Sequence, residues 1–462
     1  MPTFDSNLIA QWTKGRWLSA APPYFCGVSI DSRSLDPGNL FVAIRGVRYD
    51  GHVFLQEAFK KGAAAAMVCR ERLNGNESGP LLSVHDTAQA LRDMATAYRR
   101  LIGLSVIAVT GSVGKTTVKE MVADVLASRL STARTRGNWN NAIGLPLSLL
   151  NVDSSSRVGV FEVGTNHPGE LALLCQVLLP DWGLVTTLAP VHLEFFKSMA
   201  NIMEEKSSLL KSLPSGGTAI LRSDDEWYDR LRAVAPRRVI TVSMAGDADY
   251  QGISPNTWHG AAEVIEKASG ERFCFQMPLP GRHQLGNALY AIAVARLHGL
   301  AWEDIRHSLE GYRSQPMRWE CQSLNGITVV NDAYNANPVS MTVALRTFAE
   351  LPVDGRKWLV LAGMLEMGAG ETEAHENLGR MVAQGAWAGL IVVGELGSVI
   401  ASAAVKAGMA SDRVFRCRDH IVAAQRLGRE AMPGDAVLLK ASRGQRLEQV
   451  LTLWRQITVE KE

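Results

Sequence analysis

The sequence predicts an α/β protein with three domains. The chain has 462 residues, and this length suggests about three domains. An apolar strand, a glycine-bearing loop and a helix follow one another within residues 105–130. In the last third of the chain, apolar strands alternate with amphipathic helices, which is typical of a parallel sheet. The hydrophobic content of 47% is enough for sizeable packed cores.

The charge balance and the cysteines exclude several classes of function. Lysine and arginine number 48, aspartate and glutamate 46, and the net charge is +2. Without a basic tract, this balance predicts no nucleic-acid surface. The six cysteines lie far apart without a C-x-x-C pair, so they predict neither a zinc site nor a disulfide framework. The N-terminus lacks an apolar signal core, and no run reaches the ~18 apolar residues of a membrane span. We therefore expect a cytoplasmic protein without a membrane span.

The first predicted domain, residues 1–84, is a small α/β unit. We expect strands at 27–30, 40–44 and 64–68 and a helix at 52–61. These elements support a compact core of their own.

Asp31-Ser32-Arg33 follows the first of these strands directly. The tripeptide could be an ordinary β-turn. It could also be an anion site, in which the Arg33 guanidinium forks onto a phosphate and Ser32 donates its hydroxyl.

The second predicted domain, residues 85–316, contains the strand Val106–Val109, a tight loop and a helix that opens at Lys115-Thr116-Thr117. The loop amides and the helix dipole favour a bound phosphate, Lys115 adds a charge for the β- and γ-phosphates, and Thr116 has a hydroxyl for Mg²⁺. Val109 stands where the common P-loop has a glycine, so this loop, TGxxGKT[ST], is one residue tighter. The loop residues are Thr110, Gly111, Ser112, Val113 and Gly114.

An asparagine-rich turn follows, with Asn138, Asn140 and Asn141 in TRGNWNNAIGLPLSLL. Asparagines at such positions often only form turns and cap helices.

Three further residues are candidates for a metal site. Glu162 closes an apolar strand, and ligands of parallel sheets lie outside the carboxyl ends of strands. His192 follows another strand, although a solitary histidine is often purely structural. Lys206 shares the apolar face of the helix 201–213, where a lysine needs a partner or must reach solvent.

Residues 214–277 carry no motif, and a helix is expected from about His283. Asn287 lies four residues further on the same helical face. This spacing lets the two side chains contact one ligand.

The linker SQPMRWE, which contains Arg318, leads into the third predicted domain, residues 317–462. This domain is expected to be Rossmann-like, although no GxGxxG follows a first strand, so we do not predict a dinucleotide site. Strands are expected at 327–330, 358–361, 390–393 and 436–439. A polar run after the first strand is either a capping loop or a binding loop, and its residues are Asp332, Tyr334, Asn335 and Asn337.

These motifs, in this order, resemble the Mur ligase family over almost the whole chain. The resemblance includes IDSRSLDPGNLFVAIRG, the tighter P-loop, the TxGNxNNxxGxP turn, the DxYNANxxSM loop and a C-terminal KxSRxxxxE segment. It implies a uridine-nucleotide-binding first domain, a P-loop ATPase-like second domain and a Rossmann-like third domain.

The resemblance also implies roles for individual residues. ATP would contact Gly111 to Thr117, Asp332 and the adenine-side residues His283 and Asn287, with Arg318 reaching the γ-phosphate. The family has His-Asn where this chain has His283-Gln284, so Asn287 is the expected adenine-side contact. The UDP-linked substrate would contact Ser32, Arg33, Asn140, Asn141, Tyr334 and Asn335. Two Mg²⁺ ions would be held, one by Thr116 and Glu162 and the other by His192 and carbamylated Lys206.

The implied reaction is ATP-dependent amide formation through an acyl phosphate, with Lys115, Lys206, His192 and Arg318 as catalytic residues. The implied substrates are UDP-MurNAc-tripeptide and D-Ala-D-Ala, and the implied reaction is the last cytoplasmic step of peptidoglycan precursor synthesis. Members that add a diamino acid carry a DNPR motif, which is absent here, and folylpolyglutamate synthases lack a first domain like residues 1–84. We expect a monomer.

Two alternatives remain open. The chain could be another Mur-like or folylpolyglutamate-synthase-like amide ligase with a different amine donor. It could also be a non-catalytic, nucleotide-gated binding protein. Phosphate release with each co-substrate separates these hypotheses.

Overall fold

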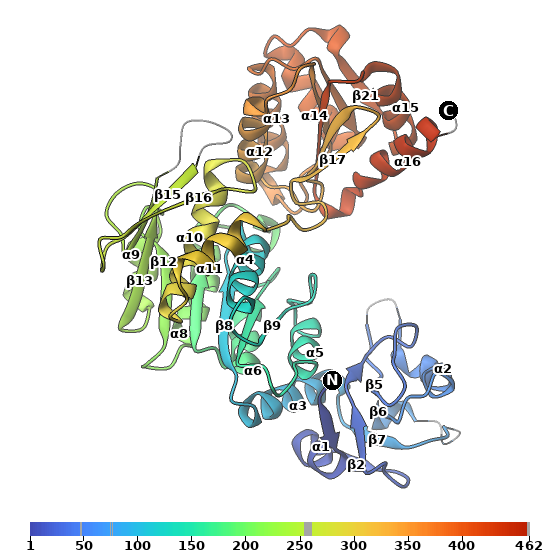
Figure 1. Ribbon diagram of the computed structural model, residues 1–462. Coiled ribbons are helices and arrows are strands. Elements are labelled where there is room, and N and C mark those ends of the chain that lie inside the picture. Colours follow the sequence, from blue (N-terminus) through green and yellow to red (C-terminus); the bar gives the residue numbers. More distant parts are fainter. Residues whose placement is uncertain (47–48, 74, 76, 254–260, 460–462) are drawn as a thin grey trace.

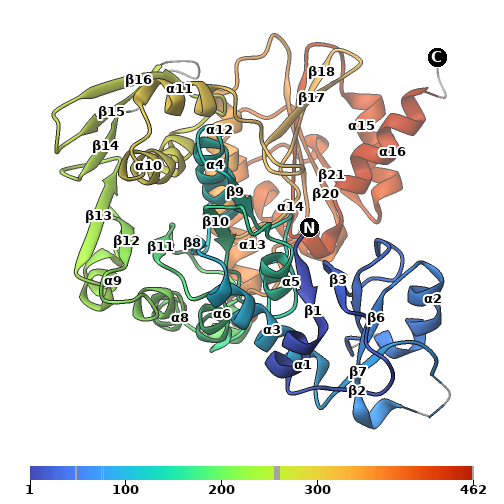
Figure 2. The ribbon, with the colours of Figure 1, turned by 60° about the horizontal axis from the view of Figure 1, so that its bottom comes forward.

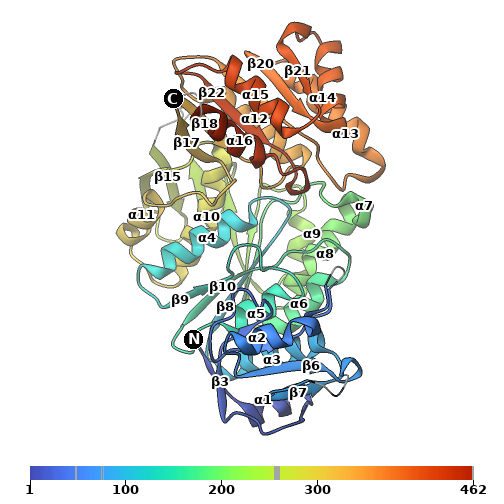
Figure 3. The same cartoon turned by 90° about the vertical axis from the view of Figure 1, so that its right-hand side faces the viewer.

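The structure is a computed structural model that describes residues 1–46, 49–73, 75, 77–253 and 261–459. It consists of three α/β bodies that follow one another along the long axis of the molecule (Figures 1 and 3). The predicted three-domain α/β fold is therefore confirmed. No helix among the described residues is long and apolar enough to cross a membrane.

The N-terminal body contains a five-stranded sheet of order β2-β7-β6-β5-β4. The strands are β2 (Arg16–Trp17), β4 (Val28–Ser29), β5 (Leu40–Val42), β6 (Ala65–Cys69) and β7 (Leu81–Val84). All three predicted strands are present but differ at their ends. The predicted helix begins as the 3₁₀ turn η1 (Gly51–Phe54) and continues as α2 (Leu55–Lys60).

A second feature of this body ties it to the middle of the molecule. A small antiparallel pair, β1 (Thr3–Asp5) and β3 (Tyr24–Cys26), packs with α1 (Ser6–Thr13) against α3 (Thr87–Leu101). Phe4 and Tyr98 contact each other edge to face with ring centroids 5.1 Å apart. The apolar core therefore runs continuously through α3 into the central body. Figure 2 shows α3 lying beside α1 and α6.

The central body is built on a nine-stranded sheet of order β16-β15-β14-β13-β12-β11-β8-β10-β9. Its first seven strands in the chain are parallel: β8 (Ser105–Thr110), β9 (Thr132–Arg134), β10 (Val158–Glu162), β11 (Trp182–Val185), β12 (Thr218–Arg222), β13 (Arg238–Ser243) and β14 (Tyr250–Ile253). The strands β15 (Ala261–Glu266) and β16 (Arg272–Gln276) extend it in antiparallel fashion. The stretch 214–277, for which the sequence showed no motif, therefore supplies most of one wing of the sheet.

Helices cover both faces of this sheet because its strands are apolar on both sides. One layer contains α4 (Lys115–Ala127), α10 (Arg282–Leu297) and α11 (Trp302–Glu310). The opposite side carries α5 (Gly144–Leu150), α6 (Glu170–Leu178), α8 (Met199–Lys211) and α9 (Tyr228–Val234). The short helix α7 (Leu193–Phe196) lies between α8 and the C-terminal body. Residues at the carboxyl ends of β8, β10 and β11 line cavities together with residues of the C-terminal body.

The C-terminal body has a six-stranded sheet of order β17-β18-β22-β19-β20-β21. The predicted strands are present as β18 (Ile327–Asn331), β19 (Lys357–Leu361), β20 (Gly389–Val393) and β22 (Ala436–Lys440), and β17 (Glu320–Leu324) and β21 (Val414–Cys417) lie at the edges. One face packs on α12 (Pro338–Glu350), α13 (Glu371–Ala383) and α14 (Gly394–Lys406), and the other on α15 (His420–Glu430) and α16 (Glu448–Val459).

Candidate active site

The P-loop joins β8 to α4 and requires glycine at two positions. Gly111 has φ +138° and Gly114 has φ +90°. A Cβ at Gly111 would lie 2.1 Å from Thr186 Oγ1, and one at Gly114 would lie 2.6 Å from Asn287 Oδ1. Any larger residue would push the loop away from its neighbours.

The loop amides are only partly directed toward a phosphate. The N–H groups of Ser112 and Val113 donate to the Thr187 carbonyl at 3.0 and 3.1 Å. The sequence predicted that the loop amides face a phosphate, but these two amides instead pair with the segment after β11. Helix α4 has no side-chain cap at Gly114, so the N–H groups of its first turn remain available to an anion.

The Lys115 side chain folds back over this loop. Its Nζ donates to the Gly111 carbonyl at 2.8 Å and to the Ser112 carbonyl at 3.2 Å. Burial lowers the pKa of Lys115, while the Glu162 carboxylate opposes that shift. Both of these acceptors are neutral carbonyls, so the ammonium can form stronger, charge-assisted hydrogen bonds with a polyphosphate.

Glu162 is held at the carboxyl end of β10, next to β8, and is 3% exposed. Thr116 Oγ1 donates to Glu162 Oε2 at 2.7 Å, and Asn140 Nδ2 donates to Glu162 Oε1 at 2.7 Å. The hydroxyl and carboxylate oxygens are hard ligands of the kind that Mg²⁺ prefers, so this pair fits a magnesium ion. Asn140 was expected near the substrate, and it also orients this carboxylate.

His192 and Lys206 do not join Glu162 in a cluster of metal ligands. The described residues contain no group of three histidine, cysteine or acidic side chains that could hold a metal. His192 Nδ1 contacts Glu366 Oε2, and the Lys206 ammonium donates to Thr165 Oγ1. Burial lowers the pKa of His192, and the Glu366 carboxylate opposes that shift.

Lys206 is buried on α8, as its helical spacing predicted. It is 2% exposed, and its Nζ lies 5.8 Å from the centre of the Phe196 ring. Burial lowers the pKa of Lys206 to about 7. The side chain does not reach solvent, and its partner Thr165 lines the neighbouring cavity.

Two cavities meet between the central and C-terminal bodies. The first, of about 270 Å³, is lined by all the expected nucleotide residues except Gly111: Ser112, Val113, Gly114, Lys115, Thr116, Thr117, His283, Asn287, Arg318 and Asp332. The second, of about 480 Å³, includes Asn138, Asn140, Asn141, Glu162, His192 and Glu366. Five residues line both: Lys115, Arg318, Tyr334, Asn335 and Asn337. The cavities therefore adjoin at Lys115 and Arg318.

The linker residue Arg318 is presented by an unusual backbone. Met317 and Trp319, on either side of it, have φ of +60° and +53°, which side-chain-bearing residues rarely adopt. The Arg318 guanidinium lies 4.0 Å from the centre of the Tyr334 ring. Arg318 is therefore a structured part of the cavity and not a free linker residue.

Several residues of the first cavity were not identified from the sequence. Gln284, whose role as a contact was in doubt from the sequence, is 6% exposed and accepts a hydrogen bond from Asn287 Nδ2 at 3.2 Å. Burial lowers the pKa of the neighbouring His283, which was expected in this cavity, to about 4. Lys440 pairs with Asp332 at 2.6 Å, and Arg222 is a further lining residue. Lys440 could have been singled out because it lies in the KxSRxxxxE segment, whereas Arg222 has no local motif.

Some of the expected site asparagines have structural roles as well. Asn141 Oδ1 accepts the Gly144 amide at 2.8 Å at the start of α5. Asn337 caps α12 and forms a reciprocal capping box with Ser340. The capping interpretation therefore holds for these two residues, although both also face the second cavity.

Ser32 and Arg33 lie in the N-terminal body and line neither of the two cavities as far as the described residues show. Ser32 is 5% exposed, whereas the Arg33 side chain is 83% exposed. Arg33 donates through Nε and Nη2 to the Asp31 carboxylate at 2.9 and 2.8 Å, and this hydrogen bonding lowers the pKa of Asp31. The guanidinium thus has an internal partner that an anion would have to replace.

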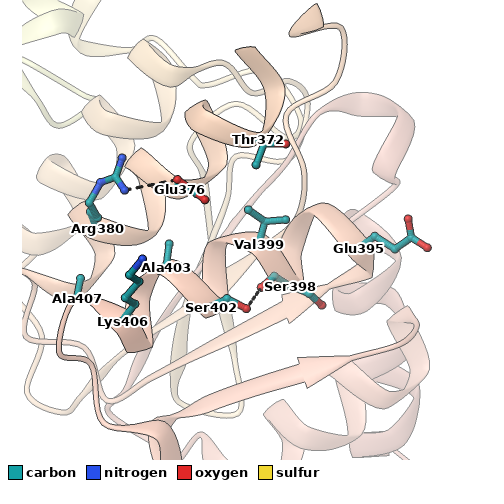
Figure 4. Close-up of a pocket in the computed structure, with 10 residues that line it drawn as sticks. All are labelled: Thr372, Glu376, Arg380, Glu395, Ser398, Val399, Ser402, Ala403, Lys406 and Ala407. Carbon is teal, nitrogen blue, oxygen red and sulfur yellow. Dashed lines mark hydrogen bonds and ion pairs between the residues drawn. The ribbon is translucent and has the colours of Figure 1, made fainter. Parts of the chain in front are cut away.

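A separate hollow of about 590 Å³ lies between α13 and α14 (Figure 4). Its walls include the exposed pair Glu376–Arg380, 3.6 Å apart, and Ser402, whose hydroxyl donates to the Ser398 carbonyl at 2.8 Å. It contains none of the residues singled out in the sequence.

Comparison with known proteins matches three family models to successive parts of the chain. They are described as the Mur ligase family catalytic domain (residues 25–99), the Mur ligase middle domain (109–295) and the Mur ligase glutamate ligase domain (317–443). The chain belongs to the Mur ligase family.

Several relatives of this Mur ligase share one name. The UDP-N-acetylmuramoyl-tripeptide–D-alanyl-D-alanine ligase of Bacillus subtilis is 34% identical over 452 residues, 96% of each chain. The ligase of the same name from Escherichia coli is 36% identical, over 76% of this chain and 77% of that one. A solved MurF structure from Acinetobacter baumannii superposes with a TM-score of 0.88 at 25% identity and 99% coverage of both chains. MurF of Thermotoga maritima in complex with ADP gives 0.80 at 27% identity, over 94% of this chain and 98% of that one.

Proposed function

We propose that this Mur ligase joins the tripeptide carboxylate of UDP-MurNAc-tripeptide to the amine of D-Ala-D-Ala, with ATP converted to ADP and phosphate. The observation that carries the proposal is the junction of the two cavities at Lys115 and Arg318. A nucleotide in the first cavity would direct its γ-phosphate to that junction, where a carboxylate in the second cavity could reach it. The names of the relatives supply the substrates.

The reaction requires two steps because a carboxylate is a poor electrophile. A carboxylate oxygen attacks the γ-phosphorus, the bond to the β-phosphate oxygen breaks, and an acyl phosphate and ADP form. The amine nitrogen then attacks the acyl carbon, phosphate leaves, and the amine releases a proton. Lys115 and Arg318 neutralise the charge that spreads over the transferred phosphoryl group. The cavity between the two bodies keeps water from the acyl phosphate.

We assign one Mg²⁺ ion to Thr116 and Glu162 and a second to His192 and Lys206. Mg²⁺ supplies neutralising charge and orients the phosphoryl oxygens. The first pair consists of hard oxygen donors in contact. The second pair requires a change at Lys206, because an ammonium repels a cation.

We infer that Lys206 is carbamylated. Its pKa of about 7 leaves a neutral amine available at physiological pH, and this nitrogen can add to the carbon of CO₂ and release a proton. The product carries a carboxylate, which suits Mg²⁺. The hydrogen bond to Thr165, which lines the second cavity, supports a location near the reacting groups.

The remaining assignments belong to the same proposal. Ser32 and Arg33 bind the uridine diphosphate, His283, Asn287 and Asp332 bind ATP, and Asn140, Asn141, Tyr334 and Asn335 face the peptide substrates. The proposal also includes the domain boundaries 1–84, 85–316 and 317–462, a monomeric state and a cytoplasmic location.

The proposal is tested by measuring ADP and phosphate release from the purified protein. Turnover is expected only when UDP-MurNAc-tripeptide and D-Ala-D-Ala are both present. Efficient addition of meso-diaminopimelate to a UDP-MurNAc-dipeptide would favour a ligase with a different amine donor. Nucleotide binding without any phosphate release would favour the nucleotide-gated binding protein.

A further inference from the structure

We propose that Arg222 contacts the base of ATP and donates a hydrogen bond to a ring nitrogen of the adenine. The inference rests on the proposed function, because it concerns the nucleotide that this reaction consumes. Arg222 is the last residue of β12 and lines the first cavity. The family resemblance implied only His283 and Asn287 on the adenine side, so Arg222 is a further determinant of nucleotide binding.

The order of the strands places Arg222 on the side of the P-loop that faces away from the reacting groups. The order is β12-β11-β8-β10, with the P-loop after β8 and Glu162 at the end of β10. The parallel register aligns Val109 of β8 with Ile220 of β12 through β11, so Arg222 is level with the P-loop and two strand spacings, about 10 Å, away from β8. Because Glu162 lines the second cavity, the γ-phosphate points toward the β10 side and the nucleoside lies toward β12.

Two hydrogen bonds hold the guanidinium of Arg222 in place. Its Nε donates to Asp224 Oδ1 at 2.6 Å, and its Nη2 donates to Asp224 Oδ2 at 3.1 Å. Asp224 is itself fixed, because its Oδ2 also accepts the Met244 amide at 3.0 Å. A forked pair of this kind fixes the plane of the guanidinium. Within the described part of the chain, Nη1 forms no hydrogen bond, so this nitrogen remains available to a ligand.

The free Nη1 lies beside the helix that supplies the other residues of the adenine side. An added Cβ on Gly286 of α10 would lie 3.4 Å from Arg222 Nη1 and 3.6 Å from Met244 Cγ. A larger residue at position 286 would therefore press on the guanidinium. Gln284 and Asn287, the near neighbours of Gly286 on α10, line the same cavity as Arg222. Polar groups from β12 and α10 thus converge on one part of the cavity.

The C-terminal body adds an apolar wall to the same cavity. Val339 and Val343 lie one turn apart on α12, and Ala344 follows them. A purine has apolar faces and a polar edge, and ligand pockets typically combine an apolar lining with a few placed polar groups. The faces of the adenine therefore pack against α12, and its edge meets Arg222.

The chemistry of the guanidinium selects the atom that it contacts. A guanidinium only donates hydrogen bonds. The 6-amino group of adenine is also a donor, whereas the ring nitrogens N1, N3 and N7 are acceptors. Nη1 of Arg222 therefore bonds to one of these three nitrogens.

The test measures binding of ADP and of inorganic tripolyphosphate to the full-length protein by isothermal titration calorimetry. Tripolyphosphate offers phosphates to the P-loop but has no base. Arg222→Ala should bind ADP about 10- to 100-fold more weakly, as for loss of one charge-assisted hydrogen bond, and should bind tripolyphosphate as the wild type does. The control is Arg232→Ala, which removes an exposed arginine of α9 and should leave both affinities unchanged. An equal loss for the two ligands overturns the inference, because it assigns Arg222 to the phosphates or to the fold.

Three ADP analogues that lack one ring nitrogen each locate the contact. Of 1-deaza-, 3-deaza- and 7-deaza-ADP, one should bind to the wild type about 10- to 100-fold more weakly than ADP. Arg222→Ala should bind that analogue and ADP equally, because the two changes remove the same hydrogen bond. A loss of the same size in the wild type and in the variant overturns the inference.

Two further measurements make the test independent of how Arg222→Ala folds. Arg222→Lys keeps a cation opposite Asp224 but lacks the second nitrogen of the fork, so it should lose affinity for ADP and not for tripolyphosphate. In the wild type alone, undiminished binding of all three analogues overturns the inference and leaves the ligase proposal intact, provided that the protein turns over D-Ala-D-Ala. A wild type that binds neither ADP nor tripolyphosphate overturns the proposed function and this inference with it.

Discussion

The Thr116 hydroxyl donates to Glu162 Oε2 at 2.7 Å and thereby joins the first turn of α4 to the end of β10. The two residues are 46 positions apart in the chain. They meet because β10 pairs with β8 in parallel, with Glu162 beside Val109, so both chain segments leave the sheet at the same edge. The pairing of β8 with β10 therefore brings together the two residues of the first proposed magnesium site.

Replacement of Glu162 tests this site. Glu162→Gln keeps the hydrogen bond from Thr116 but removes the negative charge, so we expect kcat to fall by about 10²–10³, as for loss of one preorganised electrostatic element. Raising the Mg²⁺ concentration should recover part of the loss, which a magnesium titration of the rate would show. A variant with wild-type rates at low Mg²⁺ would place the metal elsewhere.

Arg33 offers a test of the uridine site. Arg33→Ala should raise KM for the UDP-linked substrate about ten- to hundredfold, because a charge-assisted hydrogen bond is worth roughly 1.5–3 kcal/mol. KM for ATP should change little. Arg72→Ala, which removes another exposed arginine from the same body, serves as the control. An equal rise in KM for ATP would contradict a uridine site in the first domain.

The elements with a local signal were predictable from the sequence. The strand, loop and helix around Lys115 follow from an apolar run, two glycines and a helical pattern, and the burial of Lys206 follows from its place on the apolar face of α8. The alternation of strands and helices predicted the third domain, but β17 and β21, the edge strands of its sheet, were missed. Edge strands are shorter or more polar, so their pattern is weaker.

Contacts between distant parts of the chain left no such signal. Tertiary placement alone sets two of them: the Thr187 carbonyl that accepts two P-loop amides, and the Glu366 carboxylate at His192. Glu366 in particular lies 174 residues from its partner and on another body. Neither periodicity nor spacing reports such a pair.

The stacking of Arg318 on Tyr334 leads to a third prediction. A desolvated cation–π contact is worth up to about 2 kcal/mol, so Tyr334→Ala should lower kcat roughly tenfold by releasing the guanidinium. Tyr334→Phe keeps the ring face and should stay close to the wild type. Steady-state kinetics with both substrates saturating makes the comparison. Equal losses in the two variants would instead assign the effect to the Tyr334 hydroxyl.

The buried amine of Lys206 predicts a pH dependence of stability. Its pKa is about 7 in the folded chain and near 10.5 in the unfolded chain. Between these two pH values, Lys206 is protonated in the unfolded chain and neutral in the folded chain. The free energy of unfolding should therefore rise with pH from 7 to 10.5, by roughly 1.4 kcal/mol per unit at most. In CO₂-free buffer, Lys206→Met should be more stable than the wild type at pH 7. The difference between their free energies of unfolding, measured by urea unfolding, should become small at pH 10. A gap that is constant with pH would contradict the shifted pKa.

Carbamylation of Lys206 gives the last prediction. Lys206→Ala should keep the fold, because the apolar face of α8 remains, and should lose about 10²–10³ in kcat with the loss of a charged metal ligand. Acetate or formate should restore part of the activity by placing a carboxylate in the vacated space. Lys115→Ala should not respond to either acid, because the group it lacks is a cation. Mass spectrometry after trapping of the carbamate should show an added CO₂ on the wild type only. Full activity of Lys206→Ala, or an unmodified ammonium in an active, metal-bound crystal, would refute the carbamate.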